Sequence, residues 1–299
     1  MIPVKHICYL NELGQRAELE DSIFPAPGKA TLSDRLFLVC DGVGGEHKGE
    51  EASRIACESF ARYFLQFPPV PNQVDPTYIT LAQAFVLEQL AAYASLHPEA
   101  ARMSTTLALV YLDQKRVTVA WCGDSRIYHL RKGKAIWHST DHSFVSTLVQ
   151  HGEITEKEAR FHPQKNIITR SLSAAGPVSQ IDLRQLEDIQ PGDNLLLCTD
   201  GLLEQIEEER LAAILDNPNE NKAGLFMAYC RDKTRDNFSM YLITLSGQPE
   251  KTTFSNKKGW LMVFIVLLLL AFTAVWWFLM QAPAQGPVKH HYKNYTIRL

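Results

Sequence analysis

Residues 36–42 read Leu36-Phe-Leu-Val-Cys-Asp-Gly42, and residues 195–201 read Leu195-Leu-Leu-Cys-Thr-Asp-Gly201. Each stretch is an apolar run that stops at an aspartate followed by a glycine. A short, uninterrupted apolar run predicts a buried β-strand. A single Asp-Gly pair usually marks no more than a turn. Two such strands that end side by side in a sheet, however, would bring Asp41 and Asp200 together.

More acidic residues lie at the ends of other predicted strands. They are Glu20 and Asp21 before the first apolar strand, Asp124 after the run 117–122, and Asp236 at the start of the last strand. Carboxylates that lie close together repel one another and stay ionised only if a cation sits among them. Oxygen ligands favour Mg²⁺ or Mn²⁺ over zinc, and Gly42 would let the backbone approach an ion closely. The residues alone therefore predict a metal-dependent hydrolase or phosphoryl-transfer enzyme, without a finer identity.

Strands and helices segregate into separate runs within the first 245 residues. The expected strands are 35–40, 104–112, 116–121, 126–129, 194–198 and 237–245. The expected helices are 49–67, 77–95, one that begins with Asp141 as its cap and runs to 150, and one opened by the capping box Thr155–Glu158. Helix pairs between antiparallel strands favour an α+β fold in layers over parallel βαβ units.

The composition excludes several classes of protein. The 299 residues are 46% hydrophobic and 21% charged, which is an ordinary globular balance. A net charge of −3 with scattered basic residues argues against a nucleic-acid-binding protein. The six cysteines form no C-x-x-C pair and several lie in apolar runs, so we expect buried free thiols in a reducing compartment. No signal peptide is evident in the first residues.

Residues 260–280 read WLMVFIVLLLLAFTAVWWFLM and carry no charge. At about 1.5 Å per residue the segment would span roughly 30 Å, the hydrocarbon thickness of a bilayer. Trp260 lies at one end, and Trp276 and Trp277 lie near the other, where indole rings favour the membrane interface. The segment therefore predicts one transmembrane helix.

The chain is accordingly divided into a catalytic domain (1–245), a polar linker (246–258), a transmembrane helix (260–280) and a short polar tail (281–299). Lys257 and Lys258 adjoin the apolar segment on the side of the domain, as the positive-inside tendency asks. We expect a single-pass protein of the inner (cell) membrane whose catalytic domain faces the cytoplasm.

Eight motifs, taken in order, resemble the type 2C (PPM) metal-dependent serine/threonine protein phosphatases in their compact bacterial form. They are Arg16 with Glu20-Asp21, Asp41-Gly-Val-Gly-Gly45, Met103-Ser-Thr-Thr106, Gly123-Asp-Ser-Arg126, Thr140-Asp-His-Ser143, His162-Pro163 with Asn166-Ile-Ile-Thr-Arg170, Cys198-Thr-Asp-Gly-Leu202 and Asp236-Asn237. Each motif alone is weak, but together and in this order they are specific. The resemblance covers residues 1–245.

The resemblance implies a four-layer α/β/β/α sandwich, in which two antiparallel sheets are flanked by helices and the metal site lies at one end of the sheets. It implies that Asp41 bridges two Mn²⁺ or Mg²⁺ ions. Asp200 and Asp236 would complete the ligands of one ion, the Gly42 carbonyl would bind the other, and Asp21, with Glu20, would act directly or through water. In bacterial relatives a third ion binds the aspartate that corresponds to Asp124.

The resemblance also implies the reaction. Two ions would activate a bridging water for attack on the phosphorus of phosphoserine or phosphothreonine, and Arg16 would bind the substrate phosphate through paired hydrogen bonds. The catalytic residues are then Arg16 and Asp41. The expected partners are phosphorylated proteins and a serine/threonine kinase system, without nucleic acid. Some relatives have a histidine after Asp-Gly, but here Val43 follows, so the leaving group must be protonated from elsewhere.

Two alternatives remain open. One is a catalytically silent, membrane-anchored regulatory protein that uses the same fold, although such a protein is expected to lack one of Asp41, Asp200 and Asp236. The other is a different two-metal phosphoester hydrolase, such as a nuclease, which the ordered motifs and the missing basic groove disfavour.

Overall fold

The computed structural model describes residues 2–43, 48–70, 73–218, 221–246 and Trp277. The chain divides into two units, Met1–Pro249 and Glu250–Leu299. The predicted transmembrane helix and tail, and the linker beyond Ser246, lie outside the described residues, apart from Trp277. The fold that follows is that of the first unit.

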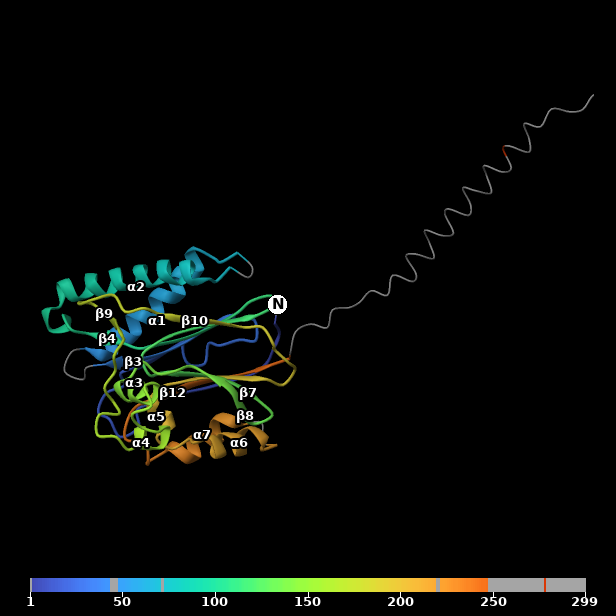
Figure 1. Cartoon of the computed structure of the whole chain (residues 1–299). Coiled ribbons are helices and arrows are strands. Elements are labelled where there is room, and N and C mark those ends of the chain that lie inside the picture. Colours follow the sequence, from blue (N-terminus) through green and yellow to red (C-terminus); the bar gives the residue numbers. More distant parts are fainter. Residues whose placement is uncertain (1, 44–47, 71–72, 219–220, 247–276, 278–299) are drawn as a thin grey trace, which may run out of the picture. The chain divides into compact units, whose positions relative to one another are not determined.

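Two antiparallel sheets form the centre of this unit (Figure 1). The first sheet has the order β1 (Val4–Glu12), β12 (Phe238–Leu245), β11 (Asn194–Cys198), β7 (Arg126–Arg131) and β8 (Lys134–His138). The second has the order β10 (Asp182–Leu186), β6 (Val117–Cys122), β5 (Leu107–Leu112), β3 (Leu36–Val43), β4 (Ser104–Thr105) and β9 (Leu172–Ser173), and β2 (Asp21–Phe24) also pairs with β3.

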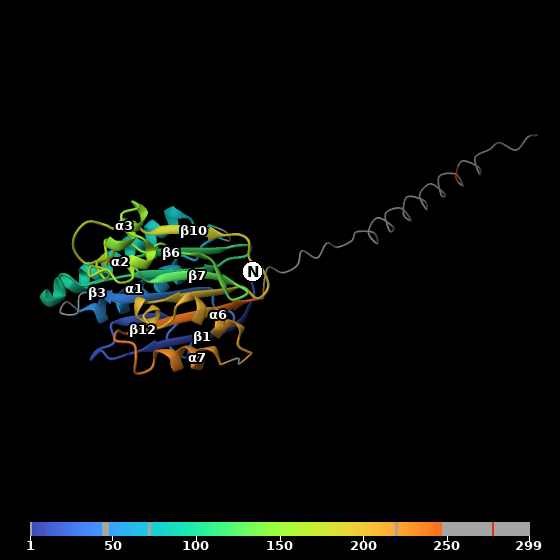
Figure 2. The same cartoon turned by 60° about the horizontal axis from the view of Figure 1, so that its bottom comes forward.

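Helices cover the outer face of each sheet. The second sheet carries α1 (Gly49–Gln66) and α2 (Pro76–Leu96), and the first carries α6 (Glu208–Asp216) and α7 (Lys222–Cys230), which Figure 2 shows beside β1 and β12. The short helices are α3 (Phe144–Gln150), α4 (Glu156–Ala159), α5 (Asp200–Leu203) and the 3-10 turn Pro98–Ala100. The arrangement is the expected α+β fold with the layers α/β/β/α.

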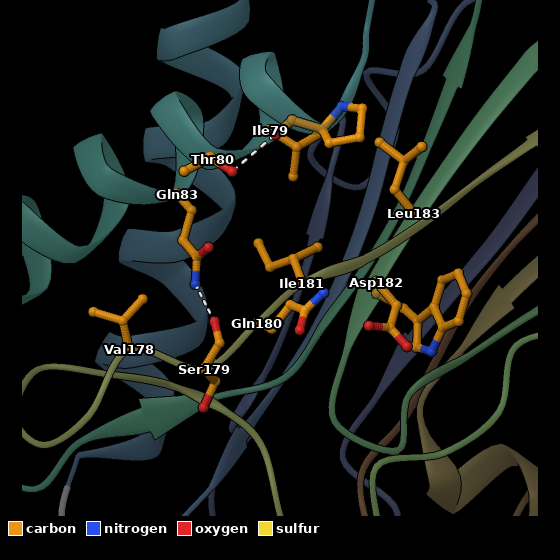
Figure 3. A pocket seen from close by; sticks show the side chains of 11 residues that line it. Ile79, Thr80, Gln83, Val178, Ser179, Gln180, Ile181, Asp182 and Leu183 are labelled. Carbon is orange, nitrogen blue, oxygen red and sulfur yellow. Dashed lines mark hydrogen bonds between the residues drawn. The ribbon is translucent and has the colours of Figure 1, made fainter.

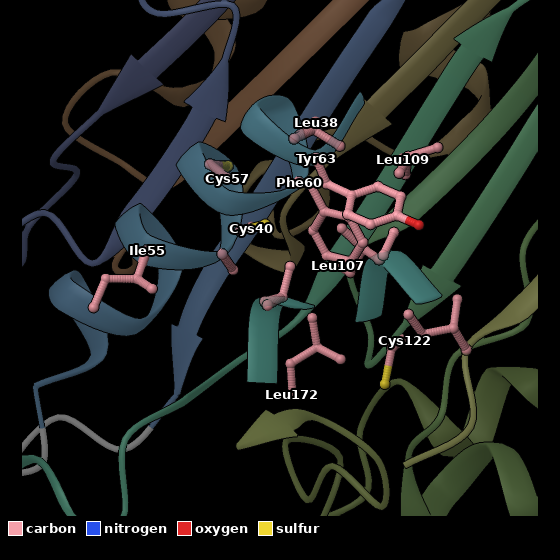
Figure 4. Packing of buried hydrophobic residues seen from close by; sticks show 14 of the residues in the cluster. Leu38, Cys40, Ile55, Cys57, Phe60, Tyr63, Leu107, Leu109, Cys122 and Leu172 are labelled. Atoms are coloured by element: carbon pink, nitrogen blue, oxygen red, sulfur yellow. The ribbon is translucent and has the colours of Figure 1, made fainter. Parts of the chain in front are cut away.

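The alternation of side chains along β3 explains why its whole run is apolar. Leu38 and Cys40 point into the core beneath α1 and α2, which Figure 4 shows, whereas Phe37 and Val39 point into the core between the two sheets. Successive side chains of a strand point to opposite faces, so a strand with a core on both faces needs apolar residues throughout. The same holds for β11, whose residues alternate between the inter-sheet core and the core beneath α6 and α7.

Some expected elements need correction. The expected strand 104–112 is two strands that break at Thr106. The Thr106 N–H still donates to the carbonyl of Asp41 at 2.9 Å, but the Asp41 N–H donates to Thr106 Oγ1 at 2.9 Å rather than to the Thr106 carbonyl. The expected helix from Asp141 begins instead after Ser143, whose side chain accepts a hydrogen bond from the Ser146 N–H. The strands β1, β2, β8, β9 and β10 and the helices α5, α6 and α7 are not among the elements predicted from the sequence.

Other expectations are confirmed. The capping box of Thr155 and Glu158 opens α4, and all six cysteines are free, five of them buried and Cys8 half-buried. Within the described residues, α2 is the one helix long and apolar enough to cross a bilayer, but core helices meet that criterion too. Its residues Ile79, Val86 and Leu90 are buried in the core shared with α1.

Candidate active site

Asp41 and Asp21 lie opposite each other on neighbouring strands. β2 and β3 pair antiparallel, with Asp21 and Asp41 as Cα partners. The backbone of Asp41 is held from the other side, because its N–H donates to Thr106 Oγ1 at 2.9 Å and its carbonyl accepts from Thr105 Oγ1 at 2.8 Å. Two strands and a threonine pair therefore fix these carboxylates side by side.

Gly42 lies where three backbone segments meet. Its N–H donates to the Glu20 carbonyl at 3.1 Å, and a Cβ at this position would lie 2.3 Å from the carbonyl oxygen of Gly49. No side chain fits there, so glycine is required for α1 to begin directly against the end of β3. The predicted role of Gly42 depends on the carbonyl of this tightly packed residue.

Asp200 and Asp236 lie next to strands of the first sheet. Asp200 is the first residue of α5, one residue beyond the end of β11, and Asp236 precedes β12. A Cβ on Gly201 would lie 1.9 Å from the Asn237 carbonyl oxygen, so the two segments touch through a glycine. The two sheets are joined here as well: Thr199 Oγ1 donates to Asp21 Oδ2 at 3.0 Å and accepts from the Ser239 N–H at 3.0 Å.

Arg16 points at this group of carboxylates. Its Nη2 donates to Asp236 Oδ2 at 2.7 Å, and 47% of its side chain is exposed. The hydrogen bond and the charge of Asp236 raise the pKa of the guanidinium, with smaller contributions from Glu20 and Asp41. The structure therefore places the predicted phosphate ligand beside the predicted metal ligands, with its other nitrogens available to solvent.

Asp124 lies in the tight turn between β6 and β7. Gly123 before it has a φ of +101°, and a Cβ there would lie 2.6 Å from Thr106 Cγ2. Ser125 Oγ, after it, lies 2.6 Å from Thr106 Oγ1. Thr106 thus connects the backbone of Asp41 with the turn that carries Asp124.

The electrostatics show that the five aspartates form one group. Burial raises the pKa of Asp41 well above its ordinary value, and the charges of Asp21, Asp200, Asp124 and Asp236 raise it further. Burial likewise raises the pKa of Asp21 to about 7 and, together with neighbouring carboxylates, those of Asp124 to about 8 and Asp200 to about 6. Burial is also the main cause of the raised pKa of Glu20.

This donor set fits divalent cations. Buried carboxylates that raise one another's pKa are stabilised in their ionised form by a positive charge placed among them, and oxygen donors suit Mg²⁺ and Mn²⁺. Among the described residues, no three His, Cys, Asp or Glu side chains are already gathered tightly around one point. The aspartates are therefore neighbours that interact through their charges rather than a closed cage.

One acidic neighbour of this group was not predicted from the sequence. Asp141, expected as a helix cap, instead accepts two hydrogen bonds from Arg126, at 2.7 Å from Nε and 2.6 Å from Nη2. Its charge raises the pKa of Asp124 and of Asp200. The position of Asp141 in the Thr-Asp-His-Ser motif was the only signal that could have placed it near the site.

A cavity of about 510 Å³ lies elsewhere, between the first half of α2 and residues 178–183 (Figure 3). The Gln83 side chain crosses it and donates to the Ser179 carbonyl at 2.6 Å. None of the predicted site residues lines this cavity.

Comparisons with known proteins show what this chain is similar to. The family model "Protein phosphatase 2C" matches residues 17–218. The serine/threonine protein phosphatase PstP of Mycobacterium tuberculosis is 31% identical over 208 residues, which are 68% of this chain and 37% of PstP. The serine/threonine phosphatase stp of Listeria innocua is 30% identical over 212 residues, 70% of this chain and 83% of stp.

A solved structure has the same fold. The catalytic domain of PstP in complex with two manganese ions superposes with a TM-score of 0.66 at 27% identity, covering 82% of this chain and 99% of that one. Because the family model matches more than half of the chain and the Listeria relative is matched over most of its length, the conclusion is direct: this chain belongs to the protein phosphatase 2C family.

Proposed function

We propose that this chain is a metal-dependent protein serine/threonine phosphatase that opposes serine/threonine kinases. The observation that carries the proposal is the convergence of Asp21, Asp41, Asp124, Asp200 and Asp236, from five separate segments and both sheets, into one electrostatically coupled group with Arg16 beside it. The relatives named serine/threonine phosphatases, and the relative solved with two manganese ions, support the same activity.

The aspartates would hold the ions. Asp41, at the centre of the group, would be shared by two Mn²⁺ or Mg²⁺ ions, with Asp200 and Asp236 on one and the Gly42 carbonyl on the other. Asp21 would contribute directly or through water, and Asp124 would hold a third ion. When bound, such ions activate a water molecule for attack on phosphorus and neutralise charge on the phosphoryl oxygens.

Arg16 would bind the phosphate of the substrate. A guanidinium offers two parallel N–H donors to a phosphate, and Arg16 is half-exposed at the edge of the carboxylate group. Its ion pair with Asp236 aims the side chain toward the ions' ligands. A phosphate held there would lie beside the proposed metal ligands.

We further propose that residues 260–280 anchor the protein in the cell membrane, with the phosphatase domain in the cytoplasm. The support is the uncharged apolar sequence, the flanking Lys257 and Lys258, and six free cysteines, which suit a reducing compartment. An anchored phosphatase would act on phosphoproteins at the membrane.

The test is hydrolysis of an aryl phosphate and of phosphothreonine and phosphotyrosine peptides by the full chain, with and without Mn²⁺. We expect Mn²⁺-dependent release of phosphate, with phosphothreonine preferred over phosphotyrosine. Binding of Mn²⁺ without hydrolysis of any of these substrates would refute the proposal and favour the catalytically silent regulator.

A further inference from the structure

The segment that carries Arg16 has no regular secondary structure of its own. Residues 13–20 connect β1 to β2 as turns and bends, and the Arg16 side chain reaches the site from the middle of this connection. The ion pair with Asp236 is made by a long, half-exposed side chain, which cannot fix the backbone below it. The position of Arg16 must therefore come from contacts of the segment's backbone.

The side chain of Asn237 makes those contacts. It is buried, with 3% of its surface exposed. Its Nδ2 donates to the carbonyls of Leu13, at 2.8 Å, and Glu18, at 3.0 Å, and its Oδ1 accepts from the Glu20 N–H at 2.7 Å. One amide group thus uses two donors and one acceptor to hold both ends of the segment around Arg16.

A second contact packs residues 13–20 against the residues that precede β12. Gly14 has a φ of +63°, and a Cβ on it would lie 1.9 Å from the Asp236 carbonyl oxygen. Gln15 Nε2 donates to the Asp232 carbonyl at 3.1 Å. Residues 13–20 therefore lie directly on residues 232–237, and the Arg16 backbone is located relative to Asp236 by packing as well as by hydrogen bonds.

We propose that Asn237 is a positioning residue for Arg16: by tying Leu13, Glu18 and Glu20 together it sets where the guanidinium meets the substrate phosphate. The inference rests on the proposed function. Asn237 does not touch substrate in this role, and its effect on the reaction passes through Arg16.

The experiment uses the full chain loaded with Mn²⁺ and a phosphothreonine peptide, and compares Asn237→Ala, Arg16→Ala and the double variant. The matched control is Asn194→Ala, which removes another side chain that bonds across the first sheet, to Thr244 Oγ1 at 2.7 Å, but at the start of β11. We expect Asn237→Ala to raise KM by about 3- to 10-fold, the scale of one or two lost hydrogen bonds, with a smaller change in kcat. Asn194→Ala should leave KM unchanged.

The double variant decides whether the effect passes through Arg16. If it does, Asn237→Ala adds almost nothing to the KM of Arg16→Ala, because two changes that act through one contact are not additive. A full additional increase in the Arg16→Ala background would overturn the proposal, as would an unchanged KM in Asn237→Ala with only a loss of thermal stability. If Asn237→Ala does not fold, Gly14→Ala, which displaces the same segment, takes its place under the same criteria.

Amide hydrogen exchange separates this proposal from the proposed function. The Glu20 N–H should exchange faster in Asn237→Ala and not in Asn194→Ala, whether or not the protein is a phosphatase. If the unchanged protein hydrolyses no phosphopeptide, the proposed function fails, and the positioning role of Asn237 is then tested by Glu20 exchange alone. Faster exchange of the Glu20 N–H in Asn237→Ala supports that role, and equal exchange refutes it.

Discussion

Thr106 shows at the residue scale how a small side chain positions carboxylates that it does not itself contact. Its hydroxyl accepts from the Asp41 N–H at 2.9 Å and lies 2.6 Å from Ser125 Oγ. One buried hydroxyl therefore links the backbones on either side of the site, those that carry Asp41 and Asp124. Thr199, by contrast, donates to the Asp21 carboxylate itself and links it to the strand β12.

Asp200→Asn and Asp236→Asn should each lower kcat/KM on the order of 10²-fold or more, the scale of losing one strong electrostatic contact in an active site. Each change removes a negative charge proposed to hold an ion but keeps the shape of the side chain. Thermal unfolding in chelator should show that the fold survives, because each change also relieves repulsion among the aspartates. Near-normal turnover of Asp200→Asn would show that Asp200 is not a ligand.

Asp124→Ala should slow hydrolysis while leaving two strong metal-binding events in calorimetry. The reason is its place in the turn after β6, where it interacts with Asp41 and Asp200 but belongs to a separate segment. The control is Asp113→Ala, an aspartate in the turn before β6. Loss of all metal binding in Asp124→Ala would contradict its assignment to a third ion.

At the scale of elements, a cluster of polar side chains holds together one end of the first sheet, the end opposite to the candidate active site. Asp193, before β11, is 1% exposed and accepts from Arg131 Nε at 2.8 Å and from the Gln190 N–H at 2.9 Å. It also lies 2.8 Å from His129 Nε2. Arg131 also forms an ion pair with Asp188, whose side chain is 76% exposed. The cluster joins β7 to the loop between β10 and β11.

Asp193→Asn should therefore destabilise the domain by about 3 kcal/mol at neutral pH, because it leaves Arg131 and its neighbours without their buried charge. Burial raises the pKa of Asp193, but hydrogen bonds from Arg131, the Gln190 amide and His129 outweigh burial and hold it below its ordinary value of 3.8. The stabilisation is thus complete above pH 3.8 and is lost as pH falls through the lower, folded-state pKa.

Urea unfolding at pH 7 and at successively lower pH measures this difference. Asp188→Asn is the control, since it removes the exposed partner of the same arginine and should cost much less. A difference between Asp193→Asn and the unchanged protein that stays constant below pH 3 would contradict the assignment to the ionised carboxylate.

At the scale of the whole molecule, the site lies at one end of both sheets, so an ion bound there contacts both halves of the fold. Mn²⁺ should consequently stabilise the folded protein. At 100 times its dissociation constant a ligand contributes about 2.7 kcal/mol, which for a domain of this size raises Tm by roughly 5–10 °C. Excess EDTA should reverse the shift and abolish hydrolysis, and Asp200→Asn should show a smaller shift. Equal Tm values with and without Mn²⁺ would refute the metal site.

The proposed topology predicts which side of the membrane each flank occupies. After the native cysteines are removed, a cysteine placed in the tail at Gln285 should react with an impermeant thiol reagent in intact spheroplasts. A cysteine at Ser255 should react only after lysis. The reverse pattern would overturn the cytoplasmic assignment, and extraction of the protein by carbonate would show that residues 260–280 do not span the bilayer.

The sequence by itself determined the buried central strands and the placing of aspartates at their ends. The runs that end at Asp41 and Asp200 are apolar on both faces, and only a strand between two cores needs that pattern. The resemblance of the ordered motifs to the type 2C phosphatases then named Arg16 and the aspartates, all of which the structure brings together. These features could be predicted because each is local, being a run, a turn or a short motif.

Only the tertiary structure decided how these local pieces meet. The break in the strand 104–112 depends on the Asp41 N–H, which donates to the side chain of Thr106, 65 residues away. Asp141 does not cap the expected helix because it pairs with Arg126 on the strand β7. The edge strands β8 and β10 escaped detection because their half-exposed residues mix polar and apolar types. The hydrogen bonds of Asn237 to Leu13, Glu18 and Glu20 join residues more than 200 positions apart in the sequence. Such bonds leave no periodic pattern in the sequence, because they depend only on how the chain folds back on itself.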